Sequence, residues 1–186
     1  MSVAELLQTF EAALQNAGLT HMVVGSFASS VHGVPRTTQD LDIVIDPDPS
    51  KLDAFVQALD PDSYYVDIDV ARQALRRRSM FNVIEMRTAW KVDLIIRKDR
   101  AFSIEELDRR IELPIFGILA PVATAEDTII SKLEWARAGE SERQLVDVAG
   151  ILRVRDATLD HHYIERWISA FELAEFWQRA KELAGD

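Results

Sequence analysis

Two aspartates two positions apart stand in the stretch TTQDLDIVID, residues 37–46. Alternate side chains of a strand share a face, so Asp40 and Asp42 point the same way while the apolar residues around them point the other way. A third aspartate, Asp93, occurs in the similar apolar run KVDLIIR. Adjacent carboxylates repel, and a buried charge is costly unless it is paired. If the two strands pair, three carboxylates converge on one point and need a cation between them.

A hard divalent cation would relieve this repulsion, because Mg²⁺ and Mn²⁺ prefer oxygen ligands and complete their shells with water and substrate phosphates. Two such ions about 3.5–4 Å apart can activate an attacking hydroxyl and stabilise a leaving pyrophosphate. The sequence therefore predicts a metal site at Asp40, Asp42 and Asp93. Two plainer interpretations stay open: backbone donors satisfy the first two carboxylates, and Asp93 forms an ion pair with Lys91 or Arg97.

A turn upstream of the aspartates carries a second chemical signal. In VVGSFASSVHG an apolar strand runs into Gly25 and Ser26, and the chain then turns into a helix. Backbone N–H groups and the helix dipole at such a start favour phosphate. Gly25 allows close approach, and the Ser26 hydroxyl can donate to a phosphate oxygen. A tight turn followed by a helix cap explains the pair equally well, and it is the nearby D-x-D strand that favours a phosphate site.

The order of these motifs resembles the nucleotidyltransferase superfamily to which DNA polymerase beta belongs. That superfamily carries Gly-Ser, then Asp-x-Asp, then a later strand aspartate. The matching residues here are Gly25, Ser26, Asp40, Asp42 and Asp93. The longer string GSFASSVHGVPRTTQDLDIVI is similar to the branch that includes the AbiEii-type toxins of type IV toxin–antitoxin and abortive-infection systems.

The toxin branch also carries a later helical motif, a lysine followed by a basic residue and an aspartate. The resemblance places this motif at Lys132, Arg143 and Asp147. It therefore reaches from about residue 21 to residue 152 and leaves the last 30 or so residues uncovered. Plainer interpretations again stay open, because surface lysines are common on amphipathic helices and Asp147 can pair with Arg143 four positions earlier.

The resemblance implies transfer of a nucleoside monophosphate (NMP) from an NTP to an acceptor hydroxyl, with release of pyrophosphate. It implies that Asp40 and Asp42 ligate Mg²⁺ or Mn²⁺, and that Asp93 ligates the catalytic ion and helps to deprotonate the acceptor. Lys132 would neutralise triphosphate charge. Asp147 would orient Lys132 or touch the acceptor.

The resemblance also implies binding residues and partners. Gly25, Ser26, Arg36 and Lys132 are the implied nucleotide-binding residues. The implied acceptor is the 3′ end of tRNA or a protein side chain, and the implied protein partner is an antitoxin. Two alternatives are a non-catalytic module that binds a nucleotide or a partner on the same fold, and phosphoester hydrolysis at the same metal centre. Neither the preferred base nor the oligomeric state follows from the sequence.

Helices and strands alternate over the first two-thirds of the chain. Apolar spacing predicts helices over 2–17, 26–33, 50–59, 69–77 and 103–110, and strands over 21–24, 41–45, 64–66, 81–86, 90–97 and 115–119. Serines cap two of these helices, Ser50 and Ser103. Further helices follow over 124–139, 141–153, 160–170 and 173–183. We expect an α+β fold in which a small mixed sheet flanked by helices forms a nucleotidyltransferase core, 1–120, with a helical part, 121–186, packed on it.

The composition is that of an ordinary globular protein, with 186 residues, 48% hydrophobic and 28% charged. The net charge of −10 argues against a broad, non-specific nucleic-acid surface but not against a local one. Basic residues cluster at 76–78 and 97–100, and a solvated face or a turn explains each cluster. The absence of cysteine excludes a disulfide framework and a cysteine metal site. Without a signal-peptide pattern or a membrane-length apolar run, we expect a cytoplasmic protein with no membrane partner.

Overall fold

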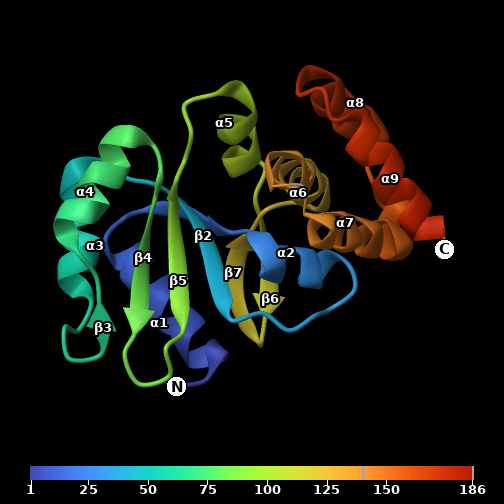
Figure 1. Cartoon of the computed structure of the whole chain (residues 1–186). Helices are drawn as coiled ribbons and strands as arrows, with labels where there is room; N and C mark the ends of the chain where they lie inside the picture. The colour runs from blue at the N-terminus through green and yellow to red at the C-terminus, as the bar shows by residue number, and fades with distance from the viewer. Residues whose placement is uncertain (140, 186) are drawn as a thin grey trace. The chain divides into compact units, whose positions relative to one another are not determined.

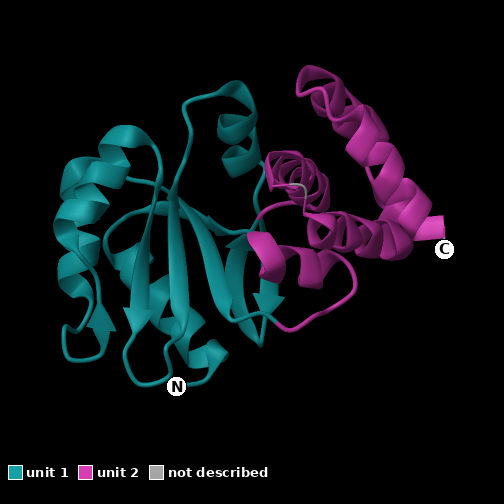
Figure 2. Ribbon diagram, viewed as in Figure 1, with its two compact units in different colours: residues 1–24, 38–122 teal, residues 25–37, 123–186 magenta. Residues whose placement is uncertain are grey.

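The structure, a computed structural model, describes residues 1–139 and 141–185 (Figure 1). Helices and strands alternate up to residue 122, and the described residues after it form helices and their connections. The predicted α+β class with a mixed sheet is confirmed. The chain forms two compact units (Figure 2), unit 1 with residues 1–24 and 38–122, and unit 2 with residues 25–37 and 123–186. Unit 2 thus adds an earlier segment to the expected C-terminal helical part, whose packing on the core stays a prediction.

Unit 1 is built on a single mixed sheet. Its strands are β1 (Thr20–Val23), β2 (Asp40–Asp46), β3 (Tyr64–Tyr65), β4 (Met80–Glu85), β5 (Lys91–Ile96), β6 (Ile111–Ile115) and β7 (Ile118–Val122). They lie in the order β3-β4-β5-β2-β1-β7-β6. β2 and β5 pair in parallel, as do β1 and β7, whereas β4 and β5 pair antiparallel. Leu41, Ile43 and Ile45 of β2 are buried on one face, and the half-buried Asp40 and Asp42 lie on the opposite face with the buried Val44.

Helices complete the core of unit 1. They are α1 (Val3–Asn16), α3 (Pro49–Ala58), α4 (Ile68–Arg77) and α5 (Ala101–Asp108). α1 begins with a capping box, in which Ser2 and Glu5 each bind the other's backbone N–H. The buried Phe10 of α1 packs against two aromatic rings. Its ring centroid lies 6.1 Å from that of Phe55 and 5.7 Å from that of Tyr64. This aromatic contact joins α1, α3 and β3 in one core.

The predicted strand at 115–119 is wrong. Phe116 and Gly117 adopt positive φ angles of 52° and 80° and form the turn between β6 and β7. The two strands pair antiparallel on either side of this turn, so the apolar run spans the tip of a hairpin.

The two predicted serine caps are also wrong. Asp48 caps α3 by accepting from the Lys51 N–H at 2.9 Å, so the helix begins before Ser50. Proline at the first helical position favours this earlier start. α5 begins at Ala101, and the Ser103 hydroxyl accepts a hydrogen bond from Arg100 Nε instead.

Unit 2 is helical in its described residues. It contains α2 (Gly25–His32), α6 (Ala125–Gly139), α7 (Glu142–Arg155), a 3₁₀ turn (Asp156–Thr158), α8 (His161–Ala170) and α9 (Ala174–Gly185). Buried apolar side chains of α6 to α9 form one core, and α2 packs against α6 and α7. The buried His32 ring donates from Nε2 to the Ala123 carbonyl at 2.7 Å. No helix of the described chain is long and apolar enough to cross a membrane.

A close backbone contact follows the end of α2. A Cβ on Gly33 would lie 2.7 Å from the Gly150 carbonyl carbon and the Ile151 nitrogen of α7. These are helix backbone atoms, so they cannot yield as a flexible side chain does. We expect Gly33→Ala to lower the free energy of unfolding by about 2 kcal/mol in urea denaturation. Gly139→Ala is the control, because its Cβ would meet nothing within 4 Å. Equal stability of the two variants would contradict the argument.

A buried ion pair in unit 1 involves a histidine. His21 donates from Nδ1 to the Leu19 carbonyl and from Nε2 to the Glu11 carboxylate, both at 2.9 Å. Burial lowers the pKa of His21, but the bonds to Glu11 and Leu19 outweigh it and raise the pKa above the ordinary value of 6.5. The protonated ring is therefore the form that the fold favours.

This histidine makes the stability of the protein depend on pH. The stabilisation is complete below pH 6.5, the ordinary pKa, and is lost as the pH rises through the higher pKa of the folded state. We expect the urea midpoint of the wild type to fall, relative to that of His21→Gln, as the pH rises from 6.5 through the higher pKa of the folded state. Glutamine does not titrate in this range. Parallel midpoint curves for the two proteins from about pH 5 to about pH 9 would show that the pair contributes nothing.

Candidate active site

Three aspartates share one face of the sheet in unit 1. The parallel register of β2 and β5 sets Asp42 opposite Asp93 and Asp40 opposite Lys91. Register partners point to the same face of a sheet, and so do residues two apart on one strand. On the other side of β5, the antiparallel strand β4 sets Asn82 opposite Asp93. One face of three neighbouring strands thus carries three carboxylates, an ammonium and an amide.

Lys91 is a cation that these carboxylates bind in the structure. Its Nζ donates to Asp93 Oδ2 at 2.9 Å and lies 3.5 Å from Asp40 Oδ1. The Asn82 amide donates to the other oxygen of Asp93. The hydrogen bond to Asp93 is the main reason that the pKa of Lys91 is raised, and the charge of Asp40 adds to it. The ion pair between Asp93 and Lys91 is therefore present. Arg97, the other partner considered for Asp93, pairs instead with Asp46, at 2.9 Å between Nε and Oδ2.

The three aspartates do not form a ready-made metal site. Within residues 1–139 and 141–185, no three or more histidine, cysteine, aspartate or glutamate side chains are arranged to hold a metal ion. The donor chemistry fits a hard cation, because carboxylate and amide oxygens are the ligands that Mg²⁺ and Mn²⁺ take. The shared face and the register bring the three carboxylates to neighbouring positions. The metal role of Asp40, Asp42 and Asp93 stays a prediction.

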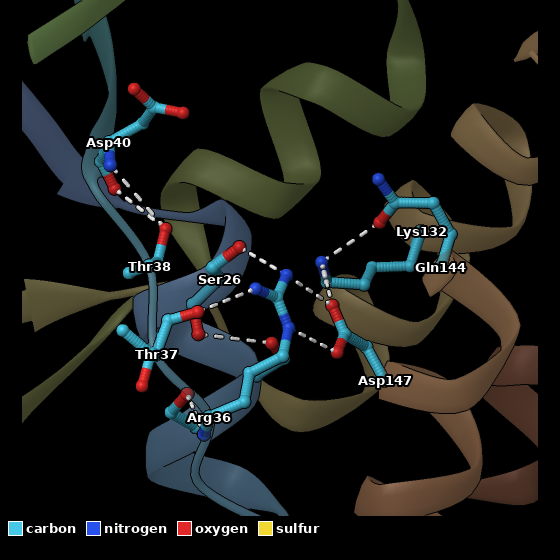
Figure 3. A network of polar contacts seen from close by, with 10 residues as sticks. Ser26, Arg36, Thr37, Thr38, Asp40, Lys132, Gln144 and Asp147 are labelled. Carbon is cyan, nitrogen blue, oxygen red and sulfur yellow. Dashed lines mark hydrogen bonds and ion pairs between the residues drawn. The ribbon is translucent and has the colours of Figure 1, made fainter. Parts of the chain in front are cut away.

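A second polar cluster lies in unit 2 (Figure 3). The Arg36 guanidinium binds the Asp147 carboxylate through two hydrogen bonds, Nε to Oδ1 at 2.7 Å and Nη2 to Oδ2 at 2.9 Å. Nη2 also donates to the Ser26 hydroxyl at 2.5 Å. Lys132 Nζ donates to Asp147 Oδ2 at 2.6 Å and to the Gln144 side-chain oxygen at 2.9 Å. The start of α2, the segment after it, α6 and α7 thus meet at one carboxylate.

The single negative charge of Asp147 forms ion pairs with two cations, Arg36 and Lys132. Its side chain is 4% exposed, that of Lys132 is 6% exposed and that of Arg36 is 22% exposed. Burial by itself raises the pKa of the Asp147 carboxyl, but Arg36 and Lys132 outweigh burial and hold the pKa below its usual range. The three side chains together keep one net positive charge. A guanidinium with planar donors and partial exposure suits a phosphate group.

The cluster in unit 2 brings together four residues that the resemblance implied. Ser26, Arg36, Lys132 and Asp147 come from distant parts of the sequence, yet hydrogen bonds connect them. Asp147 pairs with Arg36 and Lys132 and not, within the described residues, with Arg143. Their catalytic and nucleotide-binding roles stay predictions.

Gly25 is the first residue of α2, and its φ angle is +64°. A residue with a side chain adopts this conformation rarely, so the turn from β1 into α2 favours glycine there. The N–H groups of the first helical turn have no partners within the helix. They can therefore bind an anion, as the sequence suggested for this turn.

Three residues of these clusters were missed or placed differently by sequence reasoning. Lys91 was considered only as a partner of Asp93, and Asn82 and Gln144 were not considered. Asn82 could have been found, because it is a polar residue in the alternating strand β4. Gln144 stands three positions before Asp147 on one helix, a spacing that puts both on the same side.

Comparison with known proteins identifies the fold. No protein-family model and no curated protein matches the chain. Its structure is similar to that of the antibiotic-resistance factor ANT(2'')-Ia in solution, with a TM-score of 0.60, 14% identity and 98% of each chain covered. In the crystal complex of ANT(2'')-Ia with adenylyl-2''-tobramycin, the TM-score is 0.63 at 14% identity, over 92% of this chain and 98% of that chain. The chain has the nucleotidyltransferase fold.

Another structure of this fold is the lincosamide antibiotic adenylyltransferase LnuA bound to lincomycin. The TM-score is 0.53 at 14% identity, over 81% of this chain and 96% of that chain. At such identities the likeness shows the fold alone. The predicted nucleotidyltransferase fold is therefore confirmed, while the AbiEii-type branch stays a prediction.

Proposed function

We propose that the protein is a metal-dependent nucleotidyltransferase that moves an NMP from an NTP to an acceptor hydroxyl. The observation that carries this proposal is the register of β2 and β5, which sets Asp42 opposite Asp93 with Asp40 on the same face. Carboxylate oxygens from two paired strands come to neighbouring positions on one face of the sheet. A hard divalent cation is the ligand that these oxygens favour.

The proposed reaction is an exchange of bonds at the α-phosphorus of the NTP. The acceptor oxygen bonds to this phosphorus, and the bond from the phosphorus to the oxygen that bridges to the β-phosphate breaks. Asp93 takes the acceptor proton, directly or through water, and pyrophosphate leaves. Asp40, Asp42 and Asp93 would hold Mg²⁺ or Mn²⁺, which when bound supplies the positive charge that activates the hydroxyl and stabilises the leaving group.

The cluster in unit 2 supplies the proposed triphosphate contacts. Arg36 and Lys132 carry the positive charge, Ser26 carries a hydroxyl, and the α2 start from Gly25 offers backbone N–H groups. Asp147 binds both cations and so fixes where their donors point. We therefore assign Asp147 a positioning role.

The acceptor belongs to one of three classes. The first class is a hydroxyl of a small polar molecule. It is suggested by the structures of ANT(2'')-Ia with adenylyl-2''-tobramycin and of LnuA with lincomycin. The resemblance to AbiEii-type toxins adds two classes, the 3′ end of tRNA and a protein side chain, and an antitoxin as partner. The net charge of −10 opposes a large RNA surface. Binding of a structured RNA would also weaken steeply with added salt.

A labelling experiment tests the proposal. The purified protein is incubated with each α-³²P-labelled NTP and Mg²⁺ or Mn²⁺, together with cell RNA, cell protein, tobramycin or lincomycin. A labelled product that the wild type makes and Asp42→Ala does not make supports the proposal and names both substrates. Metal-dependent nucleotide binding without any product favours the non-catalytic binding module. Release of free NMP without a modified acceptor favours hydrolysis.

A further inference from the structure

We propose that Lys91 is the resident counter-ion of Asp40 and Asp93, which a divalent cation must displace in order to bind these carboxylates. The inference rests on the proposed metal site and adds its regulation. The free protein binds the metal weakly because an ammonium already neutralises part of the carboxylate charge. Lys91 thereby sets the concentration of Mg²⁺ or Mn²⁺ at which the protein is loaded.

The position of Lys91 supports this competition. It lies opposite Asp40 in the β2–β5 register and two positions before Asp93 on its own strand. Its Nζ is 2.9 Å from Asp93 Oδ2 and 3.5 Å from Asp40 Oδ1, so it bridges the carboxylates of two strands. An ammonium and a metal ion repel each other, and they cannot both bind these oxygens at such distances.

The contacts of Asp93 show which atom changes partner. Oδ1 accepts from the Asn82 amide, and Oδ2 accepts from Lys91. If the ammonium left, Oδ2 would be open to a hard cation, while Asn82 would still orient the carboxylate. The Asp93 side chain is 9% exposed, whereas that of Lys91 is 39% exposed. The lysine can therefore move its charge into solvent along a flexible stem, while the carboxylate stays in place.

A purely structural ion pair predicts a different outcome. If Lys91 only joined β2 to β5, its removal would weaken the fold and leave the affinity for metal unchanged. If Lys91 is a counter-ion, its removal leaves the carboxylates to repel one another. Stability without metal then falls, and the tighter metal binding restores it.

The test compares Mn²⁺ binding to the full chain of the wild type, Lys91→Met and Lys98→Met, by electron paramagnetic resonance of free Mn²⁺ without nucleotide. Methionine keeps an apolar stem and removes the charge. The exposed Lys98 is the matched control, because it lies past the far end of β5. At about 3.3 Å per residue along the strand, Lys98 lies about 20 Å from Lys91. This distance exceeds the length of about 8 Å over which salt screens charges.

We expect Lys91→Met to bind Mn²⁺ at least about tenfold more tightly than the wild type, and Lys98→Met to bind within about twofold of it. Adding Asp42→Ala to Lys91→Met should abolish the gain in Mn²⁺ affinity, because the expected binding site consists of the Asp40, Asp42 and Asp93 carboxylates. Mn²⁺ should also raise the melting temperature of Lys91→Met more than that of the wild type. If Lys91→Met does not fold, Lys91→Gln removes the same charge, keeps a hydrogen-bond donor and carries the same expectation.

Unchanged or weaker Mn²⁺ binding by the folded Lys91 variant overturns the counter-ion role. The labelling experiment separates this failure from that of the proposed function. A labelled product from the wild type together with unchanged Mn²⁺ affinity refutes the counter-ion and keeps the transferase. Tighter Mn²⁺ binding with no product from any acceptor keeps the counter-ion and refutes the transferase.

Discussion

Asp42→Ala is expected to lower the rate of NMP transfer by about a thousandfold or more while the chain stays folded. Asp42 lies on β2 directly opposite Asp93, so its loss removes one of the two carboxylates that face each other across the strands. The fold should persist, because Asp42 is only half-buried and the buried apolar residues Leu41 and Ile43 beside it are unchanged. Initial rates with labelled NTP measure the first effect, and urea denaturation measures the second.

Asp62→Ala is the matched control for this change. Asp62 is an exposed aspartate in the turn before β3, in the same unit, and its loss should leave the rate within about twofold of the wild type. Loss of Mn²⁺ binding should accompany loss of transfer in Asp42→Ala. Full activity in Asp42→Ala would mean that the aspartates bind no catalytic metal.

Asp147→Asn is expected to have the largest effect on stability. The amide keeps the shape of the carboxylate but removes the buried negative charge that Arg36 and Lys132 both bind. Breaking such a pair lowers the free energy of unfolding by about 3 kcal/mol. The KM for the NTP should rise about tenfold or more, because the two cations lose the group that positions them. Urea denaturation and steady-state kinetics measure the two effects.

The effect of Asp147→Asn should depend on pH in one direction. The pKa of Asp147 is lowered in the folded state, so its stabilisation is complete above 3.8, the ordinary pKa. The stabilisation is lost as the pH falls through the lower pKa of the folded state. The difference in the free energy of unfolding between wild type and variant should therefore be greatest at neutral pH and become smaller only below about pH 4.

Glu142→Gln is the control for this second change. Glu142 stands on the same helix as Asp147, in its exposed first turn, and loses the same charge. Only its interaction with the helix dipole is lost, which costs less than about 1 kcal/mol. An equal loss of stability in the two variants would show that the buried cluster contributes nothing of its own.

The long helices were predictable from sequence, whereas short apolar runs were not. Helix 2–17 was predicted because its apolar residues recur along one face, and α1 follows that pattern. The run 115–119 is too short for its periodicity to separate a strand from a hairpin tip. Positive φ at Phe116 is also unusual for a bulky residue, so no residue type announced the turn.

The candidate site residues were predictable, but most of their partners were not. Spacing and resemblance marked the three aspartates, yet which side chains stand beside them depends on strand register. Asp147 was open to pairing with Arg143 four positions away. Its observed partner Arg36 lies 111 positions away. Such a contact follows from the packing of α2 on α7, which local patterns do not encode.

The discontinuity of unit 2 has a consequence for biosynthesis. α2 is translated about 100 residues before α6 and α7, on which it packs. At a ribosomal rate of about 5–20 residues per second, roughly 5–20 s pass before its partners are made. β1 and β2 can pair in that interval and close residues 25–37 into a loop. A nascent chain that stops at residue 122 therefore presents Phe27 and Ala28, buried in the finished protein, to chaperones and proteases.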